Sequence, residues 1–358
     1  MKRILLIRSS AIGDLVFASP FAAALRSRYP QAHIAWLVES GLEGLLEADP
    51  CIDAVIGWPK AEWKRLLRER DYAGLRRRVR GFAAELRAHR FDTAIDLQSL
   101  LKSGWLAWLS AAPRRIGLGS REASGLLMTE VVPAGGTPGR ISSEYLHLAE
   151  RLGLDTTDFL PRLTVGDETG RKAAALLAGY GLATGAYAVL APFTTRPQKH
   201  WPEASWRALA ARVRNELGLV PVILGGPADR EAAHRIAIGA RGAVALAGLT
   251  TLAEAAAIVA GAALLIGVDT GLTHMGSAFA TPTVAIFGAT RPYLDAGRAQ
   301  TRVIWLGYGC SPCRRNPTCG GSFPCMSDID PDRVLAEARA ALARHAAHSH
   351  CPPEEKAA

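Results

Sequence analysis

The sequence lacks any apolar stretch long enough to cross a membrane. Its longest uninterrupted apolar run covers residues 255–268, which is 14 residues, whereas a membrane-spanning helix needs about 20. Lys2 and Arg3 stand near the N-terminus, but the apolar stretch after them stops at Arg8. This stretch is too short for the apolar centre of a secretory signal peptide. We therefore expect a cytoplasmic protein.

The common nucleotide-binding loops are also missing. Residues 9–14, which follow the first apolar stretch, read SSAIGD. They lack the three glycines of a dinucleotide fingerprint and the Gly-Lys-Ser/Thr ending of a P-loop, which disfavours a nicotinamide site. A turn of small residues that enters a helix can still bring backbone N–H groups close to a ligand. Asp14 is the only carboxylate in this turn, either as a helix cap or as a functional acid.

Length and charge narrow the classes further. A chain of 358 residues exceeds the roughly 250–300 residues at which a single core stops growing, so we expect two domains. The net charge is +9, and residues 60–90 hold 11 Lys and Arg against 4 Asp and Glu. Such an excess indicates an anionic partner, which is a phosphorylated substrate, an anionic lipid surface or nucleic acid. The alternative is a solvated helix face.

Short apolar runs alternate with helical patterns in both halves of the chain. This rhythm predicts parallel sheets with helices on both faces, and therefore two doubly wound α/β domains. The region between residues 165 and 185 is the expected boundary, and residues 61–89 are expected to be helical, with Gly74 as a candidate break. The expected strands are residues 3–8, 33–38, 54–57 and 93–96 in the first half, and 187–191, 220–224, 264–268 and 283–287 in the second.

Ligands of such sheets bind beyond the carboxyl ends of the strands, and two polar segments lie there in the second half. Residues 193–202 place two hydroxyls, an Arg, a Lys and a His directly after a strand. Residues 267–275 run from a strand through an Asp-Thr-Gly turn into a helix. Cationic side chains and helix-start amides both suit an anionic group such as a diphosphate. A polar loop anchored by Trp201 is the alternative for the first segment.

Four cysteines are clustered near the C-terminus with the spacing C-x2-C-x5-C-x5-C, at Cys310, Cys313, Cys319 and Cys325. In a cytosolic protein, clustered cysteines more often bind metal than form disulfides. The spacing does not match the usual paired zinc patterns. A structural metal and free thiols therefore both stay open.

The chain resembles glycosyltransferase family 9, the ADP-heptose:lipopolysaccharide heptosyltransferases. Four stretches carry the likeness in the order found in the family: RILLIRSSAIGDLVFASP at the start, FDTAIDLQSLLKSG at 91–104, FTTRPQKHWPEASW at 193–206 and IGVDTGLTHMGSAFATPTVAIFGAT at 266–290. The TTRPQKHWP form is closer to heptosyltransferase I than to heptosyltransferase II.

The resemblance implies the GT-B architecture, with two Rossmann-like doubly wound domains facing each other across a cleft. The N-terminal domain, residues 1–170, is then expected to bind the acceptor, and residues 180–330 the nucleotide sugar. The helix at 331–346 is expected to pack back on the first domain. Residues 347–358 are expected to form a frayed tail.

The resemblance also implies an inverting displacement of ADP from ADP-heptose by a Kdo hydroxyl of Kdo2-lipid A. Asp14 matches the family's catalytic aspartate and is expected to be the general base. Asp269 and Lys199 are expected to be the other catalytic residues. The donor is expected to contact Thr194, Thr195, Lys199, Asp229, Leu249, Asp269, Thr270, Gly271 and His274. The acceptor is expected to contact Lys64, Arg65, Gln98, Lys102 and Arg121.

No catalytic metal or other cofactor is expected. The Asp-x-Asp string Asp328-Ile329-Asp330 stands just before a helix, so that Asp330 reads as a cap. The expected enzyme is a monomer that does not bind nucleic acid and lies at the inner face of the inner membrane. The alternatives are a heptosyltransferase II or a family 9 enzyme with another donor or acceptor. More distant ones are a sugar-nucleotide 2-epimerase and a non-catalytic nucleotide-sugar binding protein.

Overall fold

The computed structural model describes residues 1–313 and 316–349. The first of its two compact units comprises residues 1–138 and 142–164, and the second comprises residues 139–141 and the chain from Val165 onward. The division falls at Val165, so the helix that follows this residue belongs wholly to the second unit. No helix in the described ranges has the length and hydrophobicity needed to cross a membrane.

The first unit is built on a parallel sheet of six strands in the order β3-β2-β1-β4-β5-β6. Its strands are β1 (Arg3–Ile7), β2 (His33–Glu39), β3 (Ala54–Trp58), β4 (Thr93–Asp96), β5 (Arg114–Leu118) and β6 (Glu130–Val132). Its α-helices are α1 (Ile12–Ala18), α2 (Pro20–Arg28), α3 (Lys60–Arg68), α4 (Tyr72–Ala88), α5 (Leu101–Leu109) and α6 (Ser143–Arg151).

The second unit repeats this topology, in the order β12-β11-β10-β7-β8-β9. Its strands are β7 (Tyr187–Ala191), β8 (Val220–Ile223), β9 (Val244–Ala245), β10 (Leu264–Val268), β11 (Thr283–Phe287) and β12 (Thr301–Trp305). Its α-helices are α7 (Asp167–Ala178), α8 (Glu203–Leu217), α9 (Arg230–Ala237), α10 (Leu252–Ala260), α11 (Gly271–Ala278), α12 (Pro324–Ser327) and α13 (Pro331–Ser349).

In both sheets, the strand order reverses next to the first strand. In the first unit, β1 pairs with β2 on one side and with β4 on the other. In the second unit, β7 lies between β8 and β10 in the same way. This order places the turns after β1 and β4, and those after β7 and β10, at the points where doubly wound folds bind their ligands. The α/β fold of two Rossmann-like units is therefore confirmed.

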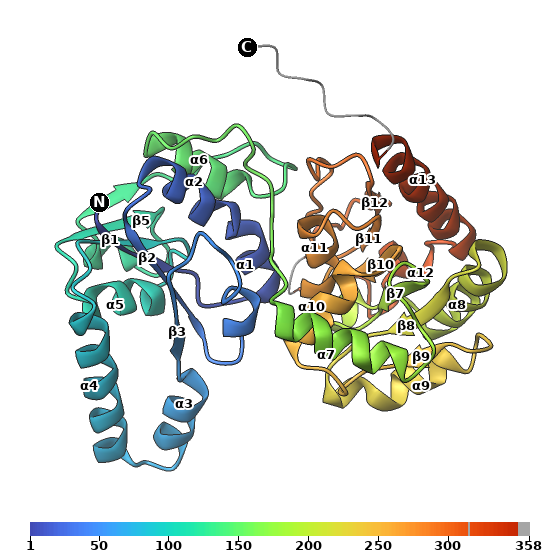
Figure 1. Cartoon of the computed structure of the whole chain (residues 1–358), viewed down its shortest axis with the longest axis horizontal. Coiled ribbons are helices and arrows are strands. Elements are labelled where there is room, and N and C mark those ends of the chain that lie inside the picture. The colour runs from blue at the N-terminus through green and yellow to red at the C-terminus, as the bar shows by residue number, and fades with distance from the viewer. Residues whose placement is uncertain (314–315, 350–358) are drawn as a thin grey trace. The chain divides into compact units, whose positions relative to one another are not determined.

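The helical segment expected at 61–89 is two helices, and the break lies before Gly74 rather than at it. Arg70 takes a positive φ of 58°, and the side chain of Asp71 caps α4 by accepting the N–H of Gly74 at 2.7 Å. The two helices form a hairpin that projects beyond the strands of the first unit (Figure 1). Gly74 is buried inside α4 against its own cap.

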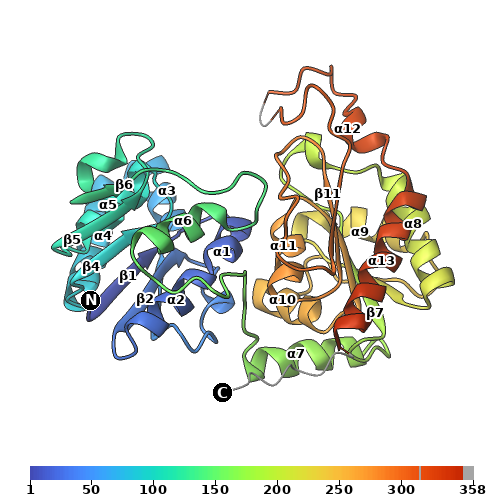
Figure 2. The same ribbon diagram turned by 90° about the horizontal axis from the view of Figure 1, so that it is seen from above.

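The last helix, α13, packs on the second unit and not on the first. Its apolar face, with Val334, Leu335 and Ala338, belongs to the hydrophobic core of that unit, and it lies beside α8 in both views (Figures 1 and 2). Arg339 adds an ion pair to Glu216 of α8 at 2.6 Å. The expectation that this helix returns to the N-terminal domain is therefore wrong. The helix also extends to Ser349, and the rest of the expected tail, 350–358, lies outside the described residues.

Gly267 in β10 is required by close packing of α11. A Cβ at this position would come within 2.1 Å of Thr273 Oγ1, which donates a hydrogen bond to the Val268 carbonyl at 2.6 Å. We expect Gly267→Ala to lower the free energy of unfolding by about 1–3 kcal/mol, as measured by denaturant titration. Gly81→Ala in α4 is the matched control, because nothing lies within 4 Å of its Cβ position. The control is expected to be neutral or stabilising by up to about 1 kcal/mol.

Candidate functional site

The carboxylate of Asp269 is the centre of a buried polar cluster at the end of β10. Lys199 Nζ lies 2.5 Å from Asp269 Oδ2, and His274 Nε2 lies 3.1 Å from Oδ1. Burial acts to raise the pKa of Asp269, but the hydrogen bond and charge of His274 and the charge of Lys199 outweigh it. The pKa therefore lies well below its usual range, and the group stays ionised. The structure thus brings together three residues from two distant segments.

Two residues of this cluster were not foreseen from the sequence. Thr290 Oγ1 donates a hydrogen bond to Asp269 Oδ2 at 2.5 Å, and the hydroxyl of Tyr293 lies 3.1 Å from His274 Nδ1. Burial raises the pKa of Tyr293, so the group stays a neutral hydroxyl. Thr290 ends the stretch 266–290 that carries the family resemblance. For Tyr293 the available signal was its place after β11, whose carboxyl end neighbours that of β10.

The start of α11 supplies the second feature that suits a phosphate. Thr270 is the N-cap residue, with extended backbone, and Gly271 is the first helical residue. The first N–H groups of a helix have no partner within it, and the helix dipole adds positive potential there. Lys199, at the end of the loop after β7, brings its ammonium to the same turn, since its Nζ also lies 3.4 Å from the Asp269 carbonyl oxygen.

The remaining predicted donor residues lie on the neighbouring loops. Thr194 and Thr195 follow β7, and the Thr194 carbonyl lies 2.9 Å from His200 Nε2. Asp229 accepts the N–H of Gly226 at 2.8 Å, so its carboxylate closes its own turn. Leu249, after β9, is 47% exposed, which leaves an apolar surface for a ligand.

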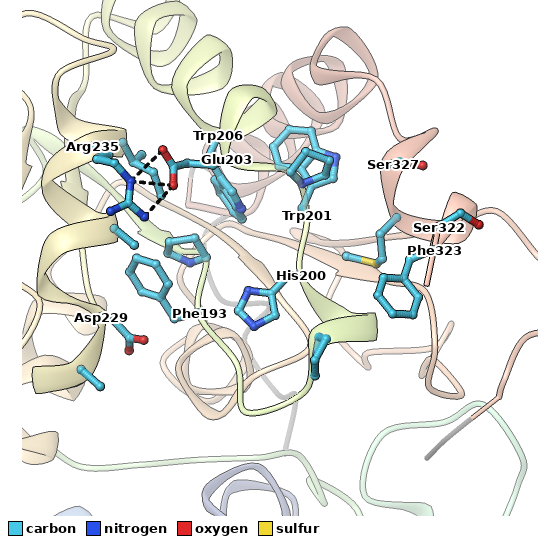
Figure 3. Close-up of a pocket in the computed structure, with 17 residues that line it drawn as sticks. Phe193, His200, Trp201, Glu203, Trp206, Asp229, Arg235, Ser322, Phe323 and Ser327 are labelled. Carbon is cyan, nitrogen blue, oxygen red and sulfur yellow. Dashed lines mark hydrogen bonds and ion pairs between the residues drawn. The ribbon is translucent and has the colours of Figure 1, made fainter. Parts of the chain in front are cut away.

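A cavity of about 460 Å³ lies beside this region and does not contain the cluster. Aromatic rings of Phe193, His200 and Phe323 surround it, and the Glu203–Arg235 ion pair lies on its wall (Figure 3). Of the predicted donor residues only Asp229 lines it. The charged cluster, and not the cavity, therefore marks the candidate site for an anionic group.

In the first unit, Asp14 forms an ion pair that the sequence did not reveal. Arg8, at the end of β1 and 8% exposed, places its NH2 group 2.5 Å from Asp14 Oδ2. The N–H of Ala11 donates to the same oxygen at 3.2 Å. Both contacts to the Asp14 side chain among the described residues thus use Oδ2. The side chain is 45% exposed, so Asp14 caps its helix and also faces solvent.

Gln98, predicted to contact the acceptor, is buried and ties two turns together. Its Oε1 accepts the N–H of Ser9 at 3.1 Å and the hydroxyl of Ser9 at 2.7 Å. Asp96 in turn accepts the N–H of Gln98 at 2.8 Å and the hydroxyl of Ser103 at 2.9 Å. These bonds fix the turn after β1, which carries Arg8 and Asp14. In the structure, Gln98 therefore holds the turn after β1 in place by linking Ser9 to Asp96.

The other predicted acceptor residues are basic side chains of the first unit. Lys64 is exposed on α3, and neighbouring Arg65 pairs with Glu69 at 2.7 Å. Arg121 lies 3.8 Å from Glu144. Lys102 on α5 is half-buried, and burial, with the charge of Lys60, lowers its pKa.

The Asp-x-Asp string and the cysteine cluster are the two segments whose residue types could bind a metal. Asp330 caps α13 by accepting the N–H of Asp332 at 2.8 Å, as expected, and Asp328 accepts the hydroxyl of Tyr308. Cys325 is buried in α12, and the thiol of Cys313 faces the Ala289 carbonyl at 4.0 Å. Burial and the neighbouring Cys313, Cys310 and Cys319 raise the pKa of the Cys325 thiol, so Cys325 lies within electrostatic reach of the other three cysteines. Within residues 1–313 and 316–349, no three acidic, His or Cys side chains are grouped to hold a metal ion. Among the described residues these thiols are neighbours that do not form a ligand group, and a structural metal at this cluster stays a prediction.

Asp96 gives the stability of the first unit a specific pH dependence. Burial raises its pKa from 3.8 to about 6, which N–H donors and Ser103 only partly offset. The folded state therefore favours the protonated acid, and its stabilising contribution is complete below pH 3.8 and lost as the pH rises through 6. We compare the free energy of unfolding of Asp96→Asn with that of the wild type. We expect the difference in favour of the variant to grow by about 1 kcal/mol as the pH rises from 5 to 7.5. Unfolding titrations at the two pH values check this, and an equal difference at both would contradict it.

Comparisons of the whole chain with known proteins point to one family. Residues 79–321 match the family model described as glycosyltransferase family 9 (heptosyltransferase). The chain is 30% identical to lipopolysaccharide heptosyltransferase 1 of Pseudomonas aeruginosa, over 88% of this chain and 87% of that protein. It is 27% identical to lipopolysaccharide heptosyltransferase 2 of Salmonella typhimurium, over 95% and 98% of the two chains.

A solved structure shares the whole fold. It is that of the Escherichia coli ADP-heptose lps heptosyltransferase II, with a TM-score of 0.75 and 25% identity over 97% of this chain and 100% of that one. Together with the family model, which covers more than half of the sequence, these matches identify the protein as a glycosyltransferase: the chain belongs to glycosyltransferase family 9.

Proposed function

We propose that this protein transfers L-glycero-D-manno-heptose from ADP-heptose to a Kdo residue of the lipopolysaccharide inner core. The names of its relatives, heptosyltransferases 1 and 2, support the sugar and the pathway. The observation that carries the donor assignment is the buried Asp269–Lys199–His274 cluster at the start of α11. The second unit would bind the donor and the first unit the acceptor.

The diphosphate of the donor is assigned to Lys199 and the first turn of α11. An ammonium has three N–H donors, so Lys199 can keep its bond to Asp269 and still donate to phosphate oxygens. The helix-start N–H groups at Thr270 and Gly271 add fixed donors that need no rearrangement. Asp269 fixes the ammonium, and Thr290 and His274 fix Asp269. The leaving diphosphate would thus meet preorganised N–H donors.

Asp14 is assigned as the general base. Its Oδ2 is held by Arg8 and by the N–H of Ala11, which leaves Oδ1 to accept the proton of the acceptor hydroxyl. The Arg8 pair orients the carboxylate. Partial exposure gives a sugar hydroxyl access to it. A base in hydrogen-bond reach of the reacting hydroxyl typically contributes about 10²–10⁴-fold to the rate.

The proposed reaction is one displacement with inversion. The acceptor oxygen forms a bond to the anomeric carbon of heptose while the bond from that carbon to the diphosphate oxygen breaks. The hydroxyl proton passes to Asp14, and ADP carries away the electron pair of the broken bond. The transition state would resemble an oxocarbenium ion, as in inverting glycosidases.

We propose that this reaction needs no metal ion. Lys199 and the start of α11 provide the positive charge that a cation would otherwise bring to the diphosphate. Both carboxylates of the Asp-x-Asp string are engaged in structural hydrogen bonds, to Tyr308 and within the first turn of α13. They are therefore not arranged to share a metal with the donor.

The choice of Kdo over the first heptose as acceptor rests on the TTRPQKHWP segment and on the greater identity to a heptosyltransferase 1. We further propose a cytoplasmic monomer that works at the inner face of the inner membrane, where a lipid-linked acceptor is presented. Lys64, Arg65, Lys102 and Arg121 supply the positive charge that the acceptor's carboxylates and phosphates require.

Removal of the Lys199 ammonium is expected to weaken donor binding. Lys199→Met should raise the Kd for ADP about 10- to 100-fold, the value of a lost charge-assisted hydrogen bond, in isothermal titration calorimetry. Lys172→Met is the matched control, since Lys172 is an exposed lysine of the same unit that pairs with Glu168. ADP binding equal to that of the wild type would remove Lys199 from the diphosphate site.

Removal of the base is expected to stop transfer without affecting the donor. We would measure ADP release from ADP-L-glycero-D-manno-heptose with Kdo2-lipid A, and separately with the heptosylated acceptor. Asp14→Asn should lower acceptor-dependent release by about 10²-fold or more and leave ADP affinity unchanged. Asp158→Asn, at an exposed aspartate of the same unit, should retain activity, and EDTA should not affect turnover.

Each alternative predicts a different outcome of this assay. Release only with the heptosylated acceptor would indicate a heptosyltransferase II. Conversion of the nucleotide sugar without any acceptor would indicate an epimerase, and ADP binding that survives in a protein without turnover would indicate a binding protein.

A further inference from the structure

Two apolar side chains stand exposed at the tip of the α3–α4 hairpin. Leu67, in the last turn of α3, is 54% exposed, and Tyr72, the first residue of α4, is 63% exposed. Only four residues separate them in the chain, across the turn at the far end of the hairpin (Figure 1). Solvated helices do not need a leucine and a tyrosine at such a position.

The hairpin is anchored firmly at its base, so its tip is held away from the sheet. Trp63 of α3 packs edge-to-face against Trp58, Phe82 and Trp105, with ring centroids 5.8, 5.5 and 5.9 Å apart. These contacts tie α3 to the end of β3, to α4 and to α5. The tip residues take no part in this aromatic core, whereas the neighbouring Leu66 is buried.

Exposed arginines lie along the same hairpin, and Arg68 and Arg70 stand between Leu67 and Tyr72 in the chain. Residues 60–90 carry a net charge of +7 out of +9 for the whole chain, from 11 basic and 4 acidic residues. Some of these charges are paired, as in Arg65–Glu69 and Arg78–Glu62. By contrast, seven exposed arginines of residues 60–90 have no ion pair within the described parts of the chain, namely Arg68, Arg70, Arg76, Arg77, Arg80, Arg87 and Arg90.

We propose that the tip of this hairpin is a docking surface for an anionic lipid bilayer. Leu67 and the ring of Tyr72 enter the boundary between headgroups and acyl chains. Arg68 and Arg70 bind lipid phosphates beside them. Apolar side chains flanked by basic ones are the composition of segments that lie in a membrane interface. A tyrosine suits that depth because its ring is apolar and its hydroxyl is polar.

This inference rests on the proposed function in one respect, because a lipid-linked acceptor gives the enzyme a reason to bind a membrane. The chemistry of the tip is independent of the transfer reaction. Lys64 and Arg65, assigned above to the acceptor, stand one helical turn before the tip. Docking through the tip would thus place these residues next to the headgroup region in which an acceptor sugar is anchored.

Vesicle binding without acceptor tests the proposal directly. We would measure flotation with vesicles of equimolar phosphatidylglycerol and phosphatidylcholine, and with vesicles of phosphatidylcholine alone. The wild type is expected to bind the anionic vesicles, less at high salt. The double variant Leu67→Gln/Tyr72→Gln should weaken binding by about tenfold or more, as the loss of buried apolar surface predicts. The matched control is Tyr180→Gln/Ile238→Gln, at residues of the second unit that are 46% and 84% exposed.

A charge variant separates docking through the tip from general attraction. Arg68→Gln/Arg70→Gln is expected to weaken binding, whereas Arg171→Gln/Arg241→Gln, at exposed arginines of the second unit, is expected to leave it unchanged. Equal losses in both pairs would overturn the proposal in favour of unspecific attraction. Unchanged binding of the Leu67/Tyr72 variant would also overturn it. Circular dichroism and ADP binding confirm that each variant is folded.

An activity readout distinguishes this proposal from the proposed function. If the enzyme transfers heptose, the tip variants should lose transfer to acceptor embedded in vesicles and keep transfer to acceptor dispersed in detergent. Absence of transfer to either form by the wild type would refute the proposed function, while flotation would still decide whether the tip docks. Equal transfer to both forms by the tip variants would refute docking as a step of the reaction.

Discussion

A buried carboxylate must be paired, and the carboxyl edge of the second sheet is arranged around that constraint. Asp269 is 14% exposed, and an unpaired charge at that depth would cost several kcal/mol. Its partners come from three segments: the loop after β7, the first turn of α11 and the loop after β11. Loss of one partner leaves the charge uncompensated, so the three loops are held together. The cluster therefore supports the fold at the edge where the ligand is expected.

The first unit carries its acid, Asp14, after a central strand as well, but this acid is exposed where Asp269 is buried. Arg8, at the end of β1, is the buried member of its ion pair, and the acid Asp14 faces solvent. An acid that only positions a cation works best when buried and fully paired. An acid that must take a proton from an incoming hydroxyl needs an accessible oxygen. The two acids of the proposed reaction thus differ in burial in the direction that their roles require.

The sequence predicted most of the central strands of both sheets but missed several strands at or near the sheet edges. All eight strands expected from apolar runs are present, because central parallel strands are buried on both faces. The four missed strands were less apparent. Strand β5 begins with Arg114 and Arg115, β6 and β9 have three and two residues, and β12 lies at the edge of its sheet. Their formation depends on pairing with a neighbour rather than on local pattern.

The site was predictable only as far as motifs reach. Asp269, Lys199 and His274 stand in recognisable segments, and the structure brings them together. Arg8 and Tyr293 were missed because their roles come from tertiary contacts. The helix break was misplaced because Gly74 is a weaker helix breaker than the turn at Arg70 and the cap at Asp71. The packing of α13 depends on which unit offers an apolar groove, and no local pattern contains that information.

The two surfaces proposed to bind anions offer different kinds of charge. The α3–α4 hairpin holds a net charge of +7 within residues 60–90, on exposed side chains. Such charge acts over about one Debye length and weakens as salt rises. At the Asp269–Lys199–His274 cluster, the charges of Lys199 and Asp269 nearly cancel, so long-range attraction of an anion is small there. Recognition must then come from short, directed N–H bonds at the start of α11, which salt screens much less. The proposed membrane contact and the proposed diphosphate site are therefore separated along the chain, and each has the kind of charge that suits its proposed ligand.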